Sequence, residues 1–316
     1  TALANKIVSI AAIDIFSCIG ENNDGTKFSS ATVLDILYGL AKARDMGCSV
    51  VNMSLGFYTD DETCIAALNE KTSELDEQGV VQVCAAGNDH TAAKSYPAAC
   101  DATLSVISLS KRGSIPSNSS TYSMKTWESA DGYMRSWFSN YGDWCDIAAP
   151  GENIYSTGVL EGTLKDGYLS MSGTSMAAPQ IAGIGALVKQ YIESKGLSRS
   201  DLTDRALAQS IMMSTAEPVV NNENDAYYPV IQQGAGMVNA AAATSADSYI
   251  KMRADATASW ADGKVKAELG DDPARTGSYD FSFTVNNLDG RTHAYALSAE
   301  LFTQALLDYE GESYLD

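Results

Sequence analysis

The segment MSGTSMAAPQIAGIGALVKQ (171–190) places Ser175 where a stretch with helical apolar spacing begins. A serine there commonly caps the first turn, because its hydroxyl accepts a hydrogen bond from an open backbone N–H. The position also suits a nucleophile, since a helix N-terminus offers free N–H groups and a dipole that favours developing negative charge. Such a serine needs a base for its proton and fixed donors for the oxyanion. The flanking residues Gly173, Ala177 and Ala178 are small enough to let a substrate backbone approach closely.

Two further loops with polar residues follow stretches that predict buried strands. VVQVCAAGND (80–89) ends in a Gly-Asn-Asp loop, and SVVNMSLG (49–56) ends in Ser-Leu-Gly. Parallel strands deliver such loops to one edge of a sheet, where ligands bind. We therefore expect the Asn88 carboxamide to be available as a second oxyanion donor. The structural alternatives are an ordinary turn at Gly-Asn-Asp and an ordinary strand end at residues 54–56.

The first half of the chain alternates apolar runs with amphipathic stretches. KIVSIAAIDIF (6–16) predicts a parallel strand buried on both faces. A helix should follow, with Ser29 or Ser30 as its N-cap and Gly47 as its terminator, and a weaker helical pattern covers 63–79. This alternation predicts an α/β fold with a parallel sheet and helices on both faces.

The pattern changes along the rest of the chain. Residues 110–142 are polar and irregular and predict a long surface excursion, after which DIAAPGENIYST (146–157) predicts a strand and a turn. We expect the serine helix to run to about residue 195 and a second helix to run from Asp201 to about Ser214. Beyond about residue 249, strict apolar alternation over 279–285 and 295–301 predicts an antiparallel hairpin. We therefore divide the chain into domains 1–248 and 249–316, the second being the start of a β-sandwich module.

Composition excludes several classes of function. The chain has 316 residues, 21 Lys and Arg against 40 Asp and Glu, and a formal net charge of −19, so nucleic acid is not an expected partner. No apolar run approaches the roughly 18 residues of a membrane span. The first residues do not have the pattern of a signal peptide, and the sequence does not begin with Met. The six cysteines are dispersed without Cys-x-x-Cys spacing, which argues against a metal cluster and leaves both free thiols and one or two disulfides open.

Over about residues 1–245 the chain resembles the subtilisin-type serine peptidases. Its motifs occur in that family's order: NMSLG (52–56), AAGND (85–89), FSNYG (138–142), IAAPG (147–151) and GTSMAAP (173–179). The resemblance implies a three-layer α/β fold and endopeptidase activity through an acyl-enzyme. It implies that Ser175 is the nucleophile and supplies one oxyanion N–H, and that Asn88 supplies the second donor. The implied substrate site, which would hold an extended peptide strand, comprises Ser54, Leu55, Gly56, Ala86, Gly87 and Thr174.

The chain lacks the two motifs that carry the catalytic base and its aspartate in this family. The family's His-Gly-Thr and Asp-Ser/Thr-Gly motifs are absent, and the two histidines, His90 and His293, lie in no such motif. We expect His90 to be a solvated loop residue and His293 to be structural. Both missing motifs belong upstream of Thr1 in the family order. The base and its aspartate are therefore expected from an upstream segment, and this chain alone is expected to be inactive.

The remaining expectations concern location, cofactors and rival functions. QGAGMVN followed by an alternating β segment is similar to lactocepin-type cell-envelope peptidases of Gram-positive bacteria, which implies a fibronectin type III-like module and an extracellular or cell-envelope location. No cofactor is expected, and calcium, which many subtilases bind, stays an alternative without identifiable ligands. Asp143, Asp146 and Glu152 lack the spacing of a calcium loop and suggest a solvated acidic face. The rival readings are a degenerate, non-catalytic subtilase that binds partners, and an acid-acting relative, which would typically carry aspartate in place of Asn88.

Overall fold

The centre of the molecule is a mostly parallel sheet. The computed structural model describes residues 8–21, 25, 27–122, 132–160, 165–221, 226–252, 263–267, 276–299, 301, 306–309 and 312–315. Within them, a five-stranded sheet has the order β3-β4-β5-β6, with β7 also paired to β5. Only β6 runs antiparallel to its neighbour. The strands are β3 (Val50–Met53), β4 (Val81–Ala85), β5 (Leu104–Lys111), β6 (Tyr133–Arg135) and β7 (Ile147–Pro150).

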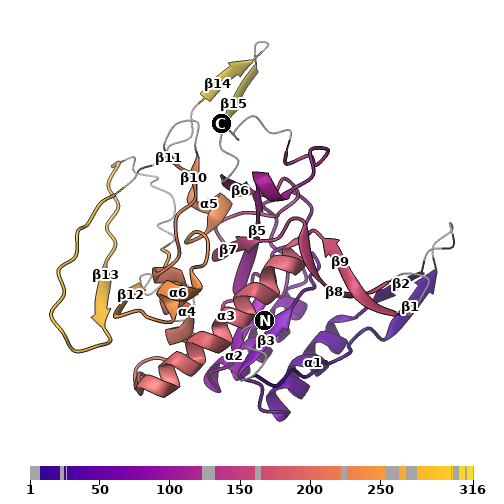
Figure 1. Ribbon diagram of the computed structural model, residues 1–316, viewed down its shortest axis with the longest axis horizontal. Helices are drawn as coiled ribbons and strands as arrows, with labels where there is room; N and C mark the ends of the chain where they lie inside the picture. The colour runs from indigo at the N-terminus through magenta and orange to yellow at the C-terminus, as the bar shows by residue number, and fades with distance from the viewer. Residues whose placement is uncertain are drawn as a thin grey trace.

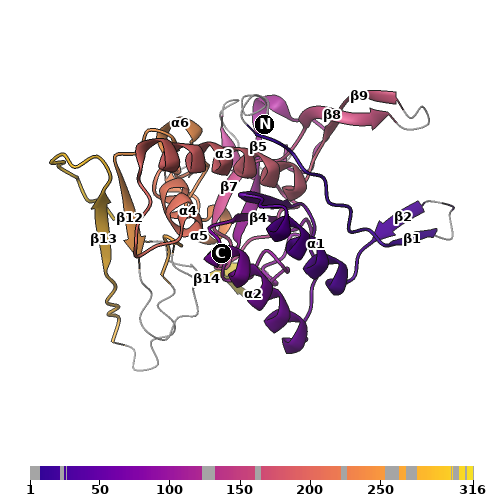
Figure 2. The ribbon, with the colours of Figure 1, turned by 90° about the horizontal axis from the view of Figure 1, so that it is seen from below.

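Helices cover both faces of this sheet, which gives three layers (Figure 2). Side chains of β4 alternate between two cores: Val81 and Val83 pack with the helices of one face, whereas Cys84 packs with those of the other. This period of two is the geometry of a strand buried on both sides. The first face carries α3 (Thr174–Lys195) and α4 (Asp204–Ser214), and the second carries α1 (Val33–Asp45) and α2 (Glu62–Glu77).

The predicted strands over 49–56 and 80–89 and the predicted helices α1, α2 and α3 are confirmed, but two helix starts were wrong. Helix α1 is capped by Thr32, whose side chain accepts from the Asp35 N–H while the Asp35 carboxylate accepts from the Thr32 N–H. Ser29 and Ser30 lie instead in β2 (Lys27–Ser30), which pairs with β1 (Cys18–Glu21). Helix α4 begins at Asp204 because Thr203 caps it.

The expected buried strand at 6–16 is wrong over the described residues 8–16. This stretch forms no strand there, and Ile10 is 73% exposed and Phe16 49% exposed. The cause is the absence of a neighbour: β3 forms the edge of the described sheet, and no described strand lies beside residues 8–16. Edge position also explains why β3 is half-buried while every residue of β4 is buried.

The expected surface excursion over 110–142 is confirmed only in part: residues 116–120 are irregular and mostly exposed, but the segment after them returns to the sheet. Strand β6 pairs with β5, and Arg135, Ser136 and Asn140 are buried. Serine, asparagine and glycine composition indicated a loop, but Ser136 and Asn140 are buried with hydrogen-bond partners, as buried polar groups usually are. Arg135 donates to the Ser139 carbonyl through Nη1, while its Nε has no hydrogen-bond partner among the described residues. Residues 123–131 of the excursion lie outside the described part of the chain.

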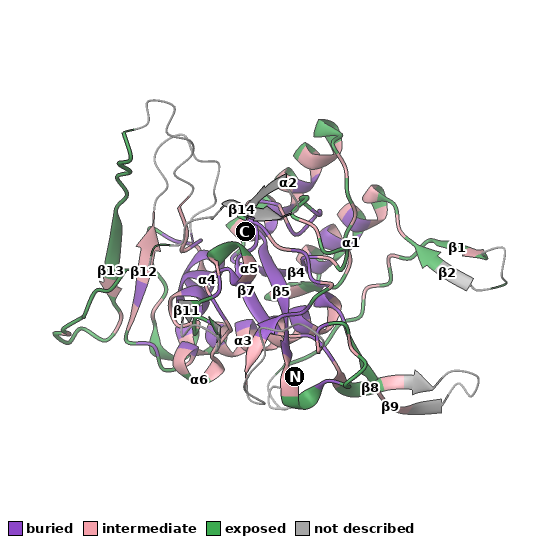
Figure 3. Cartoon of the chain, turned by 90° about the horizontal axis from the view of Figure 1, so that it is seen from above, coloured by how far each residue is buried: buried purple, intermediate pink, exposed green. Residues whose placement is uncertain are grey.

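Several short antiparallel pairs surround the core. The β1–β2 and β8–β9 hairpins project from one side of the molecule, and β12–β13 lies on the opposite side (Figure 1). Figure 3 shows that β13 is exposed whereas the central strands are buried. The remaining elements are β8 (Ile154–Leu160), β9 (Lys165–Met171), β10 (Val220–Asn221), β11 (Ala226–Tyr227), α5 (Val230–Gln233), α6 (Ala240–Ala243), β12 (Ser248–Met252), β13 (Phe283–Asn287), β14 (Leu306–Tyr309), β15 (Glu312–Leu315) and a 3₁₀ turn, Arg112–Ser114.

The expected hairpin between 279–285 and 295–301 is wrong. Strand β13 pairs with β12 across residues 248–252, and the described residues 295–299 and 301 form no strand. Strand β12 is in turn held on the hydrophobic core of the α3–α4 face, where Tyr249 is buried and the Ile250 N–H donates to Ser214. The alternating pattern identified a strand correctly but not its partner. The division of the chain at residue 248 stays a prediction.

Two further expectations concern cysteines and membranes. All six cysteines are free thiols, which resolves the alternative left open by their spacing. Burial raises the pKa of Cys100 to about 12, so this thiol is protonated at neutral pH. Among the helices that the structure describes, none has the length and apolar character needed to cross a bilayer.

Candidate active site

Three segments that are distant in sequence meet at the carboxyl edge of the sheet. Because β3 and β4 are parallel, the residues after them emerge at the same edge, and the N-terminus of α3 lies against both. The Ser54 hydroxyl donates to the Ser175 carbonyl at 2.9 Å, and the Thr174 N–H donates to Asn88 Oδ1 at 2.8 Å. The structure thus brings residues 54–56, 86–88 and 173–175 together, as the strand-end argument predicted.

Ser175 is not a helix cap. The N-cap of α3 is Gly173, which makes no side-chain cap bond, and Ser175 is the second residue of the helix. Its Oγ contacts the Ser54 carbonyl at 3.4 Å, and its N–H lies in the first turn, where no intrahelical acceptor exists. Within the described residues the Ser175 N–H donates to no other group. The capping interpretation is therefore wrong, and both the hydroxyl and the N–H are available.

The orientation of the Asn88 carboxamide follows from its partners. The Thr174 N–H can only donate, so the oxygen of Asn88 faces it, and the Thr174 hydroxyl donates to the same oxygen at 3.0 Å. The Asn88 Nδ2 therefore points away from Thr174 as a donor. It lies 3.4 Å from the place where a Cβ on Gly173 would stand, which puts the donor beside the turn that carries Ser175.

Glycine is required at position 173 for backbone reasons. Its φ of 155° and ψ of 159° fall in a region that is essentially restricted to glycine. The Gly173 N–H donates to the Gly151 carbonyl at 2.8 Å, and its own carbonyl accepts from Met176. This strained residue turns the chain from β9 into α3, so that the first N–H groups of the helix face the Asn88 loop.

Residues 54–56 directly follow β3 at its carboxyl end. No described strand pairs with them, and Ser54 and Gly56 are exposed while Leu55 is half-buried. On the opposite side of the site, Gly87 donates its N–H to the Thr174 hydroxyl at 3.0 Å, and Ala86 is buried behind it. The expected substrate residues therefore lie close to Ser175 but differ in exposure: Ser54 and Gly56 are exposed, Leu55 and Gly87 are half-buried, and Ala86 and Thr174 are buried.

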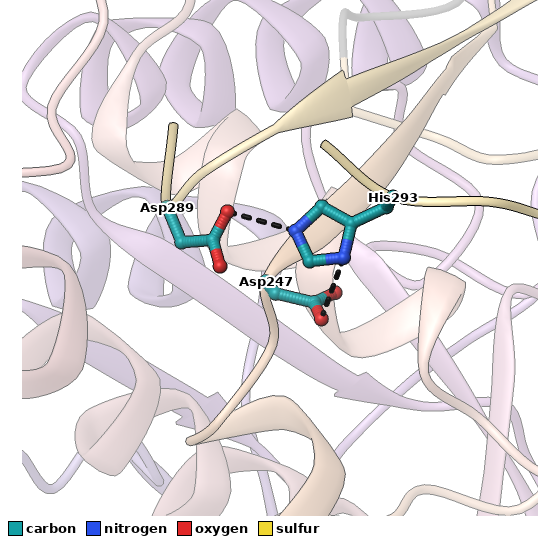
Figure 4. A group of neighbouring side chains, drawn as sticks. All are labelled: Asp247, Asp289 and His293. Carbon is teal, nitrogen blue, oxygen red and sulfur yellow. Dashed lines mark hydrogen bonds and ion pairs between the residues drawn. The ribbon is translucent and has the colours of Figure 1, made fainter. Parts of the chain in front are cut away.

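Among the described residues, no contact joins His90 or His293 to Ser175. His90 is exposed, with Nδ1 against the Trp137 carbonyl and 3.5 Å from an Arg135 nitrogen. His293 lies between two carboxylates, with Nε2 2.8 Å from Asp289 and Nδ1 3.5 Å from Asp247 (Figure 4). The atoms of this trio that could bind a metal lie within 4.8 Å of one another. Both ring nitrogens of His293 therefore contact a carboxylate, which supports the structural role expected of this residue.

The ion pairs of His293 predict a measurable titration shift. The hydrogen bond to Asp289, followed by the charges of Asp289 and Asp247, raises the pKa of His293 above its usual value. We expect Asp289→Asn to lower that pKa in an NMR titration, and Asp280→Asn, an exposed aspartate on the same segment, to leave it unchanged. Because the folded pKa is raised, the stabilising contribution is complete below the unfolded pKa and is lost as pH rises through the folded value. An unchanged pKa in Asp289→Asn would contradict this assignment.

The expected solvated acidic face is wrong for two of its three residues. Asp143 is exposed, but Asp146 and Glu152 are buried. Glu152 accepts hydrogen bonds from Ser110 and Ser119, and Asp146 is paired with Lys264 and Lys266. The sequence gives little sign of these pairings, because the lysines lie more than a hundred residues away along the chain.

Sequence reasoning also missed Asn140, which is hydrogen-bonded to the 86–91 loop. This residue belongs to FSNYG (138–142), which was matched as a motif without a role for its members. The feature that marks Asn140 is the complete burial of its side-chain amide within a polar segment, and only the structure reveals this burial.

Comparison with known proteins identifies the family of the chain. Residues 19–236 match the Subtilase family (Peptidase_S8). The chain is 34% identical over 215 residues to M-protease of Shouchella clausii (strain KSM-K16) and 33% identical over 215 residues to alkaline elastase YaB of Bacillus sp. (strain YaB). Each alignment covers 68% of this chain and 45% of the relative, so the chain spans less than half the length of these curated relatives.

Solved structures share the fold. The prenylagaramide maturation protease PagA matches with a TM-score of 0.53 at 22% identity, over 70% of this chain and 69% of that one, which supports the fold alone. A protease from Pseudoalteromonas arctica PAMC 21717 matches with a TM-score of 0.50 at 30% identity, over 69% of this chain and 59% of that one. With the family match spanning well over half of its residues, this chain belongs to the subtilases, the subtilisin-like serine peptidases.

Proposed function

We propose that this chain carries the nucleophile and the oxyanion hole of a serine endopeptidase. The observation that carries the proposal is the convergence of the Ser175 hydroxyl, the free Ser175 N–H and the outward-facing Asn88 amide at one edge of the sheet. Donors held in place before the reaction stabilise charge that develops on a substrate carbonyl oxygen, because they need no reorganisation in the transition state.

The reaction would proceed by acyl transfer. Ser175 Oγ attacks the scissile carbonyl carbon while its proton passes to a histidine base, and the carbonyl oxygen becomes an oxyanion that accepts from the Ser175 N–H and Asn88 Nδ2. Collapse of this intermediate breaks the C–N bond, and the histidine gives its proton to the leaving amine. Water then attacks the acyl-enzyme by the same route, which releases the acid and restores the serine.

The substrate would bind as an extended strand beside residues 54–56. These residues continue β3 past its last paired residue, and the backbone of an exposed strand edge pairs readily with an added strand. Main-chain pairing would place the scissile carbonyl next to Ser175, which contacts the Ser54 carbonyl. Leu55 would then contribute to the walls of the side-chain pockets.

We infer that the base and its aspartate come from a segment upstream of Thr1. The distribution of apolar surface supports this: β3 has a free edge, and the described residues 8–19 expose Val8, Ile10, Phe16 and Ile19. Exposed apolar residues in one contiguous run indicate a surface that another segment covers. A strand from the upstream segment would pair with β3 and shield this run.

Location and the C-terminal module complete the proposal. We infer an extracellular or cell-envelope location and a fibronectin type III-like module that begins near residue 249, from the similarity of QGAGMVN and its continuation to lactocepin-type peptidases. The antiparallel β12–β13 pair is consistent with the first strands of such a module. No metal or organic cofactor is required by this chemistry.

The experiment compares this chain with the same protein extended upstream through the two missing motifs. We expect the extended protein to hydrolyse a chromogenic peptide and the chain alone to show a rate lower by about a million-fold, because the catalytic groups act as a unit. Adding the upstream segment as a separate polypeptide should restore part of the rate. Comparable activity of the chain alone would disprove the need for an upstream base, and an inactive extended protein would favour a non-catalytic binding role.

A further inference from the structure

Asn140 makes four side-chain hydrogen bonds, three of them to the 86–91 loop that carries Asn88. Its Nδ2 donates to the Ala86 carbonyl at 2.9 Å and to the Tyr58 hydroxyl at 2.8 Å. Its Oδ1 accepts from the Asp89 N–H at 3.0 Å and from the Thr91 N–H at 3.3 Å. A carboxamide offers two donors and two acceptor lone pairs, so all of its capacity is used. The side chain is fully buried, which makes each of these bonds costly to lose.

These bonds, together with the backbone of Asn140, fix the two peptide groups that flank Asn88. The carbonyl of the first, Gly87 C=O, accepts from the Asn140 N–H at 2.9 Å. The N–H of the second, Asp89 N–H, donates to Asn140 Oδ1. The Cα of Asn88 therefore joins two peptide planes, and each of these planes is hydrogen-bonded to Asn140. The direction of its Cα–Cβ bond, and hence the reach of its carboxamide, is set by that residue.

We propose that Asn140 is a positioning residue for the oxyanion hole, which acts by holding both peptide planes next to Asn88. This inference rests on the proposed function and deepens it. Thr174 fixes the far end of Asn88 by binding its Oδ1, and Asn140 fixes the near end through the backbone. Together they leave Nδ2 as the one group of Asn88 that is directed at a substrate.

The site does not accept a different polar side chain. Backbone N–H groups face Oδ1 and a backbone carbonyl faces Nδ2, so the amide has a single orientation. In Asn140→Asp the second carboxylate oxygen would face the Ala86 carbonyl, and repulsion would replace a hydrogen bond. The packing is equally close, since a Cβ on Gly87 would stand only 2.3 Å from Asn140 Nδ2.

The test is a double-mutant cycle in the upstream-extended protein, with kcat and KM measured for one peptide substrate. Removing an oxyanion donor costs about a hundredfold to a thousandfold in kcat, so we expect that loss in Asn88→Ala. We expect Asn140→Ala to lower kcat by at least about tenfold but by no more than Asn88→Ala does, with KM changed by less than about twofold. In the Asn88→Ala background, Asn140→Ala should lower kcat by less than about twofold, because the donor it positions is already absent.

A buried amide elsewhere provides the matched control. Gln82 is fully buried in β4 and donates to the Thr72 carbonyl, away from the loop. Gln82→Leu should lower the thermal midpoint without changing kcat per folded molecule. If Asn140→Ala does not fold, Tyr58→Phe replaces it: this residue is 46% exposed and loses only the hydroxyl that accepts from Asn140 and donates to Asp89. Its kcat should fall about two- to tenfold, and only when Asn88 is present.

The outcomes separate the two proposals. An equal kcat loss from Asn140→Ala, or from Tyr58→Phe in its place, with and without Asn88 would show a general structural role and overturn the inference, while the proposed function would stand. An unchanged kcat in Asn140→Ala would also overturn it. An unchanged kcat in Asn88→Ala would remove the oxyanion assignment itself, and the positioning role would fall with it.

Discussion

Replacing Ser175 with alanine is expected to lower the kcat/KM of the upstream-extended protein by about a million-fold. The variant loses the oxygen that attacks the carbonyl, while the fold around it is kept, because Ser175 is only half-buried and its hydroxyl makes one long contact to Ser54. Hydrolysis of a chromogenic peptide over a wide range of enzyme concentrations measures the loss, and circular dichroism checks that the helix is retained.

The same helix supplies a control. Ser194 is exposed near the C-terminal end of α3, where its hydroxyl donates to the Tyr191 carbonyl. Ser194→Ala should keep the full rate. Retention of more than about a hundredth of the activity in Ser175→Ala would mean that another group attacks the substrate, since oxyanion stabilisation and binding alone leave far less.

The second large effect is expected at Asp146, whose carboxylate is completely buried at the amino-terminal end of β7. Lys266 Nζ lies 2.7 Å from Oδ1 and Lys264 Nζ lies 3.3 Å from Oδ2, and the Ser105 N–H donates to Oδ2 at 2.9 Å. Lys264 is itself only 6% exposed at its side chain. Lys264 and Lys266 thus neutralise a charge in the protein interior.

Asp146→Asn is therefore expected to destabilise the protein by roughly 3–5 kcal/mol, because it leaves buried ammonium groups without their counter-ion. Combining it with Lys264→Met and Lys266→Met should recover most of that loss, since apolar side chains of similar size tolerate burial. Chemical denaturation measures each free energy of unfolding. A pair whose carboxylate is exposed gives the control: Lys251→Met removes the contact with Asp201, which is 64% exposed at its side chain and stays hydrated, so the loss should be less than about 1 kcal/mol.

The stability contributed by Asp146 and its two lysines is expected to fall in acid. Burial alone would raise the pKa of Asp146, but the charges of Lys264 and Lys266 outweigh it and hold that pKa below its usual value. The stabilisation is therefore complete above the unfolded pKa of about 3.9 and is lost as pH falls through the lower folded value. An Asp146→Asn protein as stable as the parent would show that these lysines do not depend on the carboxylate.

Much of the site was accessible from sequence because it depends on local rules. Ser175, Asn88 and residues 54–56 each follow or begin an element whose apolar period is clear, and parallel strands bring such ends to one edge. The capping choice at Thr32 was missed because three candidate residues with hydroxyls lie within four positions, Ser29, Ser30 and Thr32, and the capping box with Asp35 decides between them.

The errors share a physical cause, which is dependence on a distant partner. The apolar run at 6–16 predicted a buried strand, but a strand needs a neighbour, and no described strand lies beside residues 8–16. Strand β13 has the expected alternation but pairs with β12. Asn140 and Asp146 look like surface residues in a polar stretch, and only the tertiary contacts with the 86–91 loop and with Lys264 and Lys266 explain their burial.

The central claim is that Ser175 is the nucleophile of a site completed by Asn88, and covalent labelling tests it most directly. A fluorophosphonate probe reacts with an activated serine and leaves a phosphonyl group on its oxygen. After treatment of the upstream-extended protein, peptide mass mapping should find the adduct on Ser175, with a labelling rate that falls sharply in Asn88→Ala. An adduct on a different residue, or rapid labelling of Ser175 that is indifferent to Asn88, would contradict the account.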